Sequence, residues 1–148
     1  MLILRCSTPR SIEWCRVHAA NIRLHLNAWH TNSRYKKKML TSCYFCARQV
    51  QDSLEHIFHC HVVQSVFPRG WRGDVAKCLF LSSHTEDDIL LASILVYGLY
   101  AFHCSARHSE TPRHSELKGS ILRLIGKVSF DMRLSNLWRE RLWSIGWR

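Results

Sequence analysis

The sequence predicts a mainly α protein, a small helical bundle that carries a zinc knuckle of the Cys-Cys-His-Cys type. Three observations support this prediction. Apolar residues make up 47% of the 148 residues, which is enough for a buried core. Apolar side chains recur at steps of three and four residues over long segments, as in amphipathic helices. Four residues within one short segment also have the types and spacing of zinc ligands: Cys43, Cys46, His56 and Cys60.

A first helix is expected to begin near Ser11, whose side chain can cap it. Its expected buried face repeats every three or four residues: Ile12, Cys15, Ala19, Ile22, Leu26 and Trp29. Arg16 and Arg23 fall largely on the other side. That side is either a stripe that contacts phosphates or an ordinary solvated helix face.

A basic run follows the first helix: Arg34, Tyr35, Lys36, Lys37 and Lys38. Such cations neutralise phosphates, and neighbouring aromatic rings stack on unpaired bases. The rings in question are Tyr35, Tyr44 and Phe45, although Phe45 can equally fold back onto the metal site as part of a core. The run is therefore a candidate nucleic-acid-binding segment.

The knuckle itself comes next in the chain. Cys43 and Cys46, two residues apart, can bind one metal ion from a tight turn. His56 and Cys60 are four apart, so we expect them on one face of a short helix. Asp52 is the expected cap of that helix, with Glu55 three residues later as in a capping box. The alternatives are a redox dithiol and a pair of buried thiols; no strand pattern precedes the cysteines, which disfavours a thioredoxin-like dithiol.

The identity of the fourth ligand has an alternative in His59. Cys60 is favoured, because three cysteines and one histidine are a common structural zinc set. A site closed by four protein ligands leaves no position for water. We therefore expect Zn²⁺ to stabilise the fold and the chain not to be an enzyme.

The remaining chain predicts further helices. The knuckle helix should end before Pro68, and residues 75–81 can form one or two helical turns. Thr85 and Asp88 form a capping-box pattern, which explains the local acids better than a magnesium site does. Residues 89–104 are almost wholly apolar but shorter than the about 20 residues of a membrane span. They predict a central buried helix and no membrane.

A last helix is expected from Ser115, with Leu117 and Ile121 on its apolar stripe. A tail with Trp138, Trp143 and Trp147 either docks onto the core or binds a protein partner. The predicted division of the chain is residues 1–67, with the first helix, basic segment and knuckle, and residues 68–148, a helical region packed on them.

Charge and cysteine usage indicate the partners and the compartment. The formal net charge is +10, which favours polyanions such as RNA or DNA as partners. Seven cysteines without a visible secretory signal favour a reducing compartment, nuclear or cytoplasmic. The other four cysteines are then expected to be plain thiols: Cys6, Cys15, Cys78 and Cys104.

The stretch from about residue 21 to residue 60 resembles the zinc-binding segment that lies C-terminal to the polymerase domain in non-LTR retrotransposon reverse transcriptases. The matching residues are Leu26-Asn27-Ala28-Trp29-His30-Thr31 with Arg34, then the two cysteines of the turn, Asp52-Ser53-Leu54-Glu55-His56-Ile57-Phe58 and Cys60. The resemblance implies zinc on Cys43, Cys46, His56 and Cys60, and a role in holding template nucleic acid. No polymerase motif is found in the chain, so the resemblance implies the C-terminal tail of such an element, as a fragment, a degenerate copy or a recruited small protein.

Overall fold

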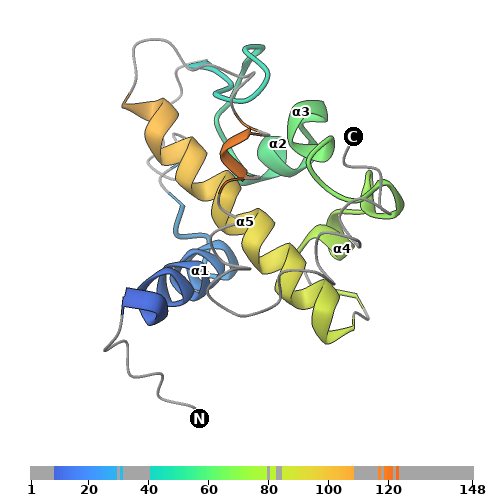
Figure 1. Cartoon of the computed structure of the whole chain (residues 1–148). Coiled ribbons are helices and arrows are strands. Elements are labelled where there is room, and N and C mark those ends of the chain that lie inside the picture. Colours follow the sequence, from blue (N-terminus) through green and yellow to red (C-terminus); the bar gives the residue numbers. More distant parts are fainter. Residues whose placement is uncertain are drawn as a thin grey trace.

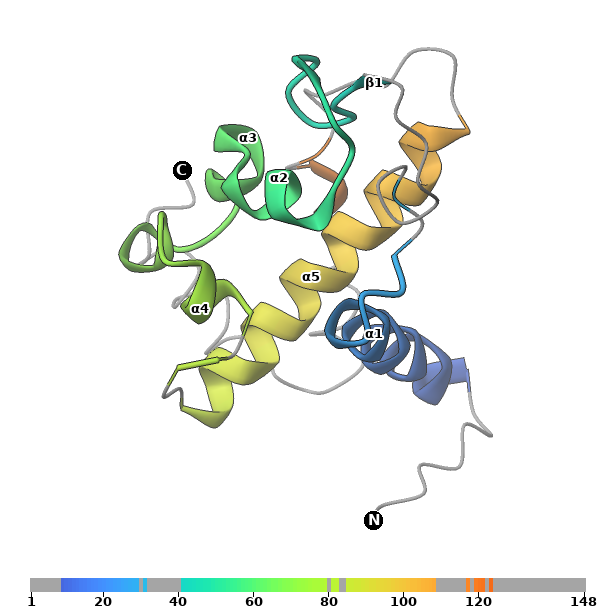
Figure 2. The ribbon, with the colours of Figure 1, turned by 180° about the vertical axis from the view of Figure 1, so that it is seen from behind.

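Helix α5, Glu86–Arg107, runs through the middle of the computed structural model (Figures 1 and 2). Helix α1, Pro9–His25, crosses α5 on one side. The short helices α2, Leu54–His59, α3, His61–Gln64, and α4, Val75–Cys78, lie along the other side. A one-turn 3₁₀ helix, η1, Arg69–Trp71, connects α3 to α4.

The structure describes residues 9–29, 31, 41–79, 81–82, 85–108, 117, 119–121 and 123. The basic run Arg34, Tyr35, Lys36, Lys37 and Lys38 lies outside these residues, as do the three tryptophans of the C-terminal tail. The predictions for both segments therefore stay predictions. So does the division at residue 67, although a single cluster of buried side chains contains residues from both sides of it.

Helix α1 begins two residues before the expected start, at Pro9. Proline is favoured at the start of a helix, where its missing N–H would have no intrahelical acceptor. The helix ends at His25, and Asn27, two residues later, has a left-handed φ of 49°. Asn27 N–H donates to the carbonyl of Leu24, and Ala28 N–H donates to that of Arg23. These two bonds form a Schellman motif, in which asparagine tolerates the left-handed conformation.

The buried face predicted for the first helix was right for Trp29, which is fully buried, but wrong for Ile22 and Leu26. Val17, Ala20 and Leu24 are buried, whereas Ile22 and Leu26 are 59% and 72% exposed. Both sets have helical periodicity, because apolar residues occupy more than one side of this helix. Contact with α5 decides between them: the Asn21 side chain, next to the buried set, donates to the Ser93 carbonyl of α5 at 3.3 Å.

The capping box predicted for the central helix is confirmed. Asp88 N–H donates to Thr85 Oγ1 at 3.2 Å, and Thr85 N–H donates to the Asp88 carboxylate at 3.3 Å. Side chains along α5 are buried at Leu91, Ala92, Ile94, Leu95, Val96 and Leu99. By length and composition α5 could also cross a membrane, a test that core helices of soluble proteins pass as well.

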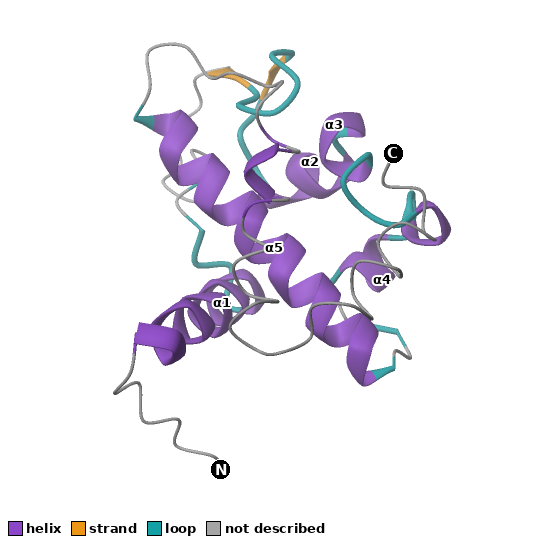
Figure 3. Cartoon of the chain, viewed as in Figure 1, coloured by secondary structure: helices purple, strands orange, loops and turns teal. Residues whose placement is uncertain are grey.

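The mainly α class is confirmed for the described part of the chain (Figure 3). Its strands are two-residue pieces, β1, Thr41–Ser42, and β2, Gln49–Val50. They pair antiparallel, with Thr41 opposite Val50. Trp29 lies at the centre of the core, where its ring packs near Phe58 and Tyr100. Leu117 and Ile121, from the predicted last helix, are buried in the same core.

Candidate metal centre

The β1–β2 hairpin positions the first two cysteines. Cys43 N–H donates to the Arg48 carbonyl at 2.8 Å, and Ala47 N–H donates to the Cys43 carbonyl at 2.9 Å. These bonds close a tight turn that contains Cys46. Ala47 has a φ of 58°, the left-handed conformation that lets the chain reverse here. The predicted metal-binding turn is thus present.

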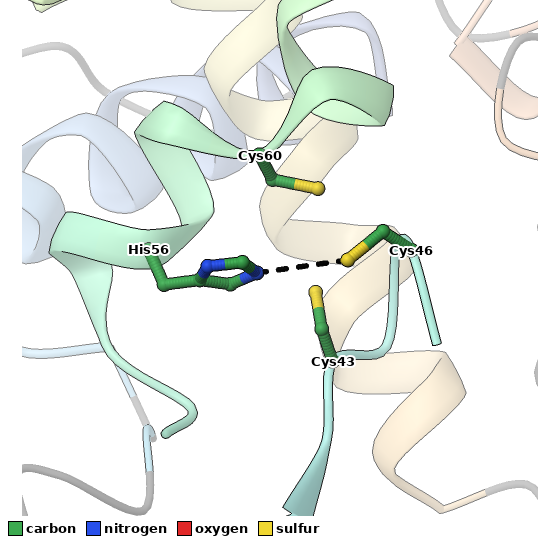
Figure 4. Close-up of side chains that lie close together, drawn as sticks. All are labelled: Cys43, Cys46, His56 and Cys60. Carbon is green, nitrogen blue, oxygen red and sulfur yellow. Dashed lines mark hydrogen bonds between the residues drawn. The ribbon is translucent and has the colours of Figure 1, made fainter. Parts of the chain in front are cut away.

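Helix α2 positions the histidine, but two details of the prediction were wrong. Its cap is Ser53, whose Oγ accepts a hydrogen bond from His56 N–H at 3.1 Å, and not Asp52. The helix also ends at His59, so Cys60 is its C-cap and not a helical residue. Cys60 N–H still donates to the Ile57 carbonyl at 3.3 Å. This bond keeps the Cys60 side chain on the same side as His56 (Figure 4).

The four side chains converge on one point, as Figure 4 shows. Their ligand atoms all lie within 4.8 Å of one another. Cys46 Sγ is 3.7 Å from His56 Nε2. A tetrahedral zinc ion with ordinary bond lengths places a sulfur and a nitrogen about 3.6 Å apart. The cluster therefore has the ligand set and the size of a structural metal site.

His59, the alternative fourth ligand, is not part of this cluster. Its side chain is exposed, and its Nδ1 lies 2.8 Å from the Glu55 carbonyl, to which it can only donate a proton. Cys60 is 2% exposed and lies beside the other ligands. Among the described residues, the geometry therefore selects Cys60.

A metal ion requires thiolate ligands, and local hydrogen bonds favour the thiolate of Cys60 but the thiol of Cys43. Phe45 N–H donates to Cys43 Sγ at 3.4 Å, an interaction that stabilises negative charge on that sulfur. Hydrogen bonding between the side chains of Cys43 and Cys60 lowers the pKa of Cys60 to about 5. The same contact raises the pKa of Cys43, because the two sulfurs share one proton. A divalent ion would replace that proton.

The turn between the first two cysteines is anchored in the protein core. Phe45 is 1% exposed and stacks on Phe102 of α5, with ring centroids 5.5 Å apart. Tyr44 is half-buried and meets the ring of His103 edge-on, with centroids 5.2 Å apart. Of the two readings for Phe45, the structure therefore supports the core residue. The Tyr44 ring already packs against His103, and its stacking on bases stays a prediction.

Sequence reasoning missed a buried ion pair behind this turn. His103 Nε2 lies 3.2 Å from Asp52 Oδ1, and the two side chains are 1% and 3% exposed. Burial lowers the pKa of His103, but its hydrogen bonds to Asp52 and Cys104 outweigh this effect and raise that pKa above its ordinary value. The pair joins the segment before α2 to α5. The two residues are 51 positions apart in the chain, so no local sequence pattern could predict their pairing.

The remaining cysteines were partly predicted. Cys78 is a buried thiol, and burial raises its pKa to about 11. Cys104 is a free, half-buried thiol, whose pKa is lowered by hydrogen bonding to His103. Cys15 is disulfide-bonded, so the expectation of a plain thiol was wrong there. Cys6 lies outside the described residues.

Comparison with known proteins identified no relative of this chain. No protein-family model matches the chain, and neither a curated protein nor a solved structure matches it. The geometry of Cys43, Cys46, His56 and Cys60 is therefore the main basis for assigning a function.

Proposed function

We propose that this chain is a non-catalytic, zinc-stabilised nucleic-acid-binding module related to the C-terminal region of retroelement reverse transcriptases. The observation that carries the proposal is the convergence of Cys43, Cys46, His56 and Cys60 within 4.8 Å. It supports a metal site in the segment that resembles the retroelement family. The basic run Arg34–Lys38 lies close in sequence to the candidate metal site, since Lys38 is three positions before β1 and five before Cys43.

Zinc is the proposed ion because of the donor set. Three thiolates and one imidazole are soft to borderline ligands, and a tetrahedral set of this kind selects Zn²⁺ over magnesium or calcium. Cys43 and Cys60 are buried, and Cys46 and His56 are half-buried. Such a shielded site with four protein ligands suits a structural ion. Equilibrium dialysis of the purified chain should give one zinc per chain, and a Cys46→Ser variant should retain none.

Nucleic-acid binding follows from the charge next to that site. The chain has a formal net charge of +10, and Lys36, Lys37 and Lys38 are part of the basic run. Binding to single-stranded RNA and DNA should weaken as salt rises, because phosphate contacts release counterions. Replacing the three lysines by glutamine should reduce the slope of log K against log salt by about 2. The triple Lys→Arg variant keeps the charge and should bind like the unaltered chain. Affinity that is independent of salt would refute the proposal.

A protein-interaction module is the second candidate function, with zinc holding only the fold. Ile22 on α1 and Leu26, the residue after its end, favour it, because both are largely exposed and lie four residues apart. The tryptophans of the C-terminal tail are the other candidate contact. Deleting the tail, or replacing Ile22 and Leu26 by serine, should then abolish partner capture and leave zinc content and salt-dependent RNA binding unchanged.

A further inference from the structure

A groove of about 480 Å³ lies beside the crossing of α1 and α5, away from the metal centre. Its side on α1 is formed by the disulfide-bonded Cys15 with Arg16, Ala19 and Arg23, and its side on α5 by Tyr97, Tyr100 and Ala101. Pockets that hold small ligands have volumes of about 300–1,000 Å³. The groove therefore has the size for one small molecule or one unit of a polymer.

The lining combines positive charge with aromatic surface. Two guanidinium groups face two tyrosines, and none of the residues lining this groove is acidic. Small side chains, Ala19 and Ala101, leave space between them. This combination fits a ligand with an anionic end and a flat apolar body. It does not fit a cation.

Arg23 and Tyr100 define one wall of the groove. The guanidinium carbon of Arg23 lies 5.6 Å from the centre of the Tyr100 ring, and Arg23 Nη1 donates to Tyr100 Oη at 3.3 Å. A guanidinium group carries five N–H donors, so the single bond to Tyr100 leaves others to contact a phosphate. The bond also holds the guanidinium in place, which reduces the entropy lost on binding.

We propose that this groove binds one nucleotide, with its phosphate on Arg16 and Arg23 and its base against Tyr97 and Tyr100. The inference deepens the proposed function and rests on it, because it assigns a place on the protein to one unit of the bound strand. A free mononucleotide offers the same chemistry. The two sources are separated by titrating adenosine monophosphate and a ten-nucleotide single strand against the zinc-loaded full chain.

Three variants test the groove. Arg23→Gln removes one charge from it, and Arg69→Gln is the matched control, since Arg69 is exposed and lies outside the groove. Tyr97→Leu keeps apolar bulk and removes the aromatic face. Zinc content and melting temperature establish that each variant is folded. Arg23→Gln and Tyr97→Leu should each weaken binding by about fivefold or more, since one base stacked on an aromatic ring or one charged contact contributes this much.

The outcomes separate the groove from the function as a whole. The proposal is supported if Arg23→Gln and Tyr97→Leu both lose affinity for a probe while Arg69→Gln changes that affinity less than twofold. The probe that shows this pattern, mononucleotide or strand, is the ligand of the groove. A strand bearing 5-iodouridine should then crosslink to Tyr97 or Tyr100 on irradiation. Strand binding that falls equally in Arg23→Gln and Arg69→Gln, without those crosslinks, overturns the groove and leaves the proposed function standing. If neither probe binds the unaltered chain, both proposals are wrong.

Discussion

The metal-binding segment, residues 43–60, and the α1–α5 pair are held together in different ways. The first consists of a hairpin with two-residue strands and a six-residue helix. Helices this short are marginal on their own. The second has helices of 17 and 22 residues that bury apolar side chains against each other. The first region also buries Phe45, Ile57 and Phe58 in the shared core. Because its helix and strands are so short, we expect it to depend on the candidate metal site more than the second region does.

The largest expected effect is the loss of the metal ion. Structural zinc sites contribute on the order of 10 kcal/mol of folding free energy, comparable with the net stability of a domain. Cys60→Ser, or a strong chelator, should therefore release zinc and lower the melting temperature sharply. Hydrogen exchange should show protection lost first in residues 43–60 and later in α5. Cys104→Ser is the control, because Cys104 is a free thiol outside the cluster. Simultaneous loss of protection in both regions would show that the α1–α5 pair depends on the metal ion as much as residues 43–60 do.

The next effect tests the core of α5. Leu95 is fully buried, and Leu95→Ala should lower the free energy of unfolding by about 2–5 kcal/mol. Ile89 lies on the same helix but is 47% exposed, so Ile89→Ala should change the free energy of unfolding by less than about 0.5 kcal/mol. Both variants should keep one zinc per chain under native conditions. Chemical denaturation and metal analysis measure the two quantities; zinc loss in Leu95→Ala would show that the regions are not separable.

The Asp52–His103 pair connects the two regions and should make stability depend on pH. The pKa of His103 is raised in the folded protein, so its contribution is complete below the unfolded value of about 6.5. That contribution is lost as pH rises through the higher folded pKa. Asp52→Asn removes the charge and should cost about 2 kcal/mol near pH 6, the value of a hydrogen bond to a charged group.

The measurement is the difference in unfolding free energy between the unaltered chain and Asp52→Asn, with zinc in excess, from pH 6 to pH 8.5. Both proteins share the pH dependence of the zinc site, so the difference isolates the pair. It should shrink as pH rises. A difference that is constant over this range would mean that His103 does not change its protonation state between pH 6 and pH 8.5.

The smallest effect compares the caps of the two regions. Ser53→Ala and Thr85→Ala each remove a helix N-cap and should cost about 1 kcal/mol. Ser53 Oγ accepts a hydrogen bond from the backbone N–H of His56, which is one of the four candidate metal ligands. Ser53→Ala should therefore weaken zinc binding in a chelator competition, whereas Thr85→Ala should not. Equal zinc affinity in both variants would separate the cap from the metal site.

Local features of the candidate site were predictable from the sequence. Two residues between Cys43 and Cys46 and three between His56 and Cys60 restrict where the side chains can point. The Thr85–Asp88 capping box is local in the same sense, since all its bonds lie within one helical turn. The identity of the α2 cap was not predictable, because Asp52 and Ser53 are both good capping residues. Pairing of Asp52 with His103 left Ser53 as the cap.

By itself, the sequence determined the helical class, the four candidate metal-binding side chains and the N-terminal end of the central helix. These depend on spacing and hydrogen bonds among near neighbours in the chain. Only the tertiary structure decided that α1 buries Val17, Ala20 and Leu24, that Asp52 meets His103, and that two arginines face two tyrosines in one groove. The physical reason is that burial and ion pairing depend on which distant segment lies opposite, and a helical period is compatible with several such partners.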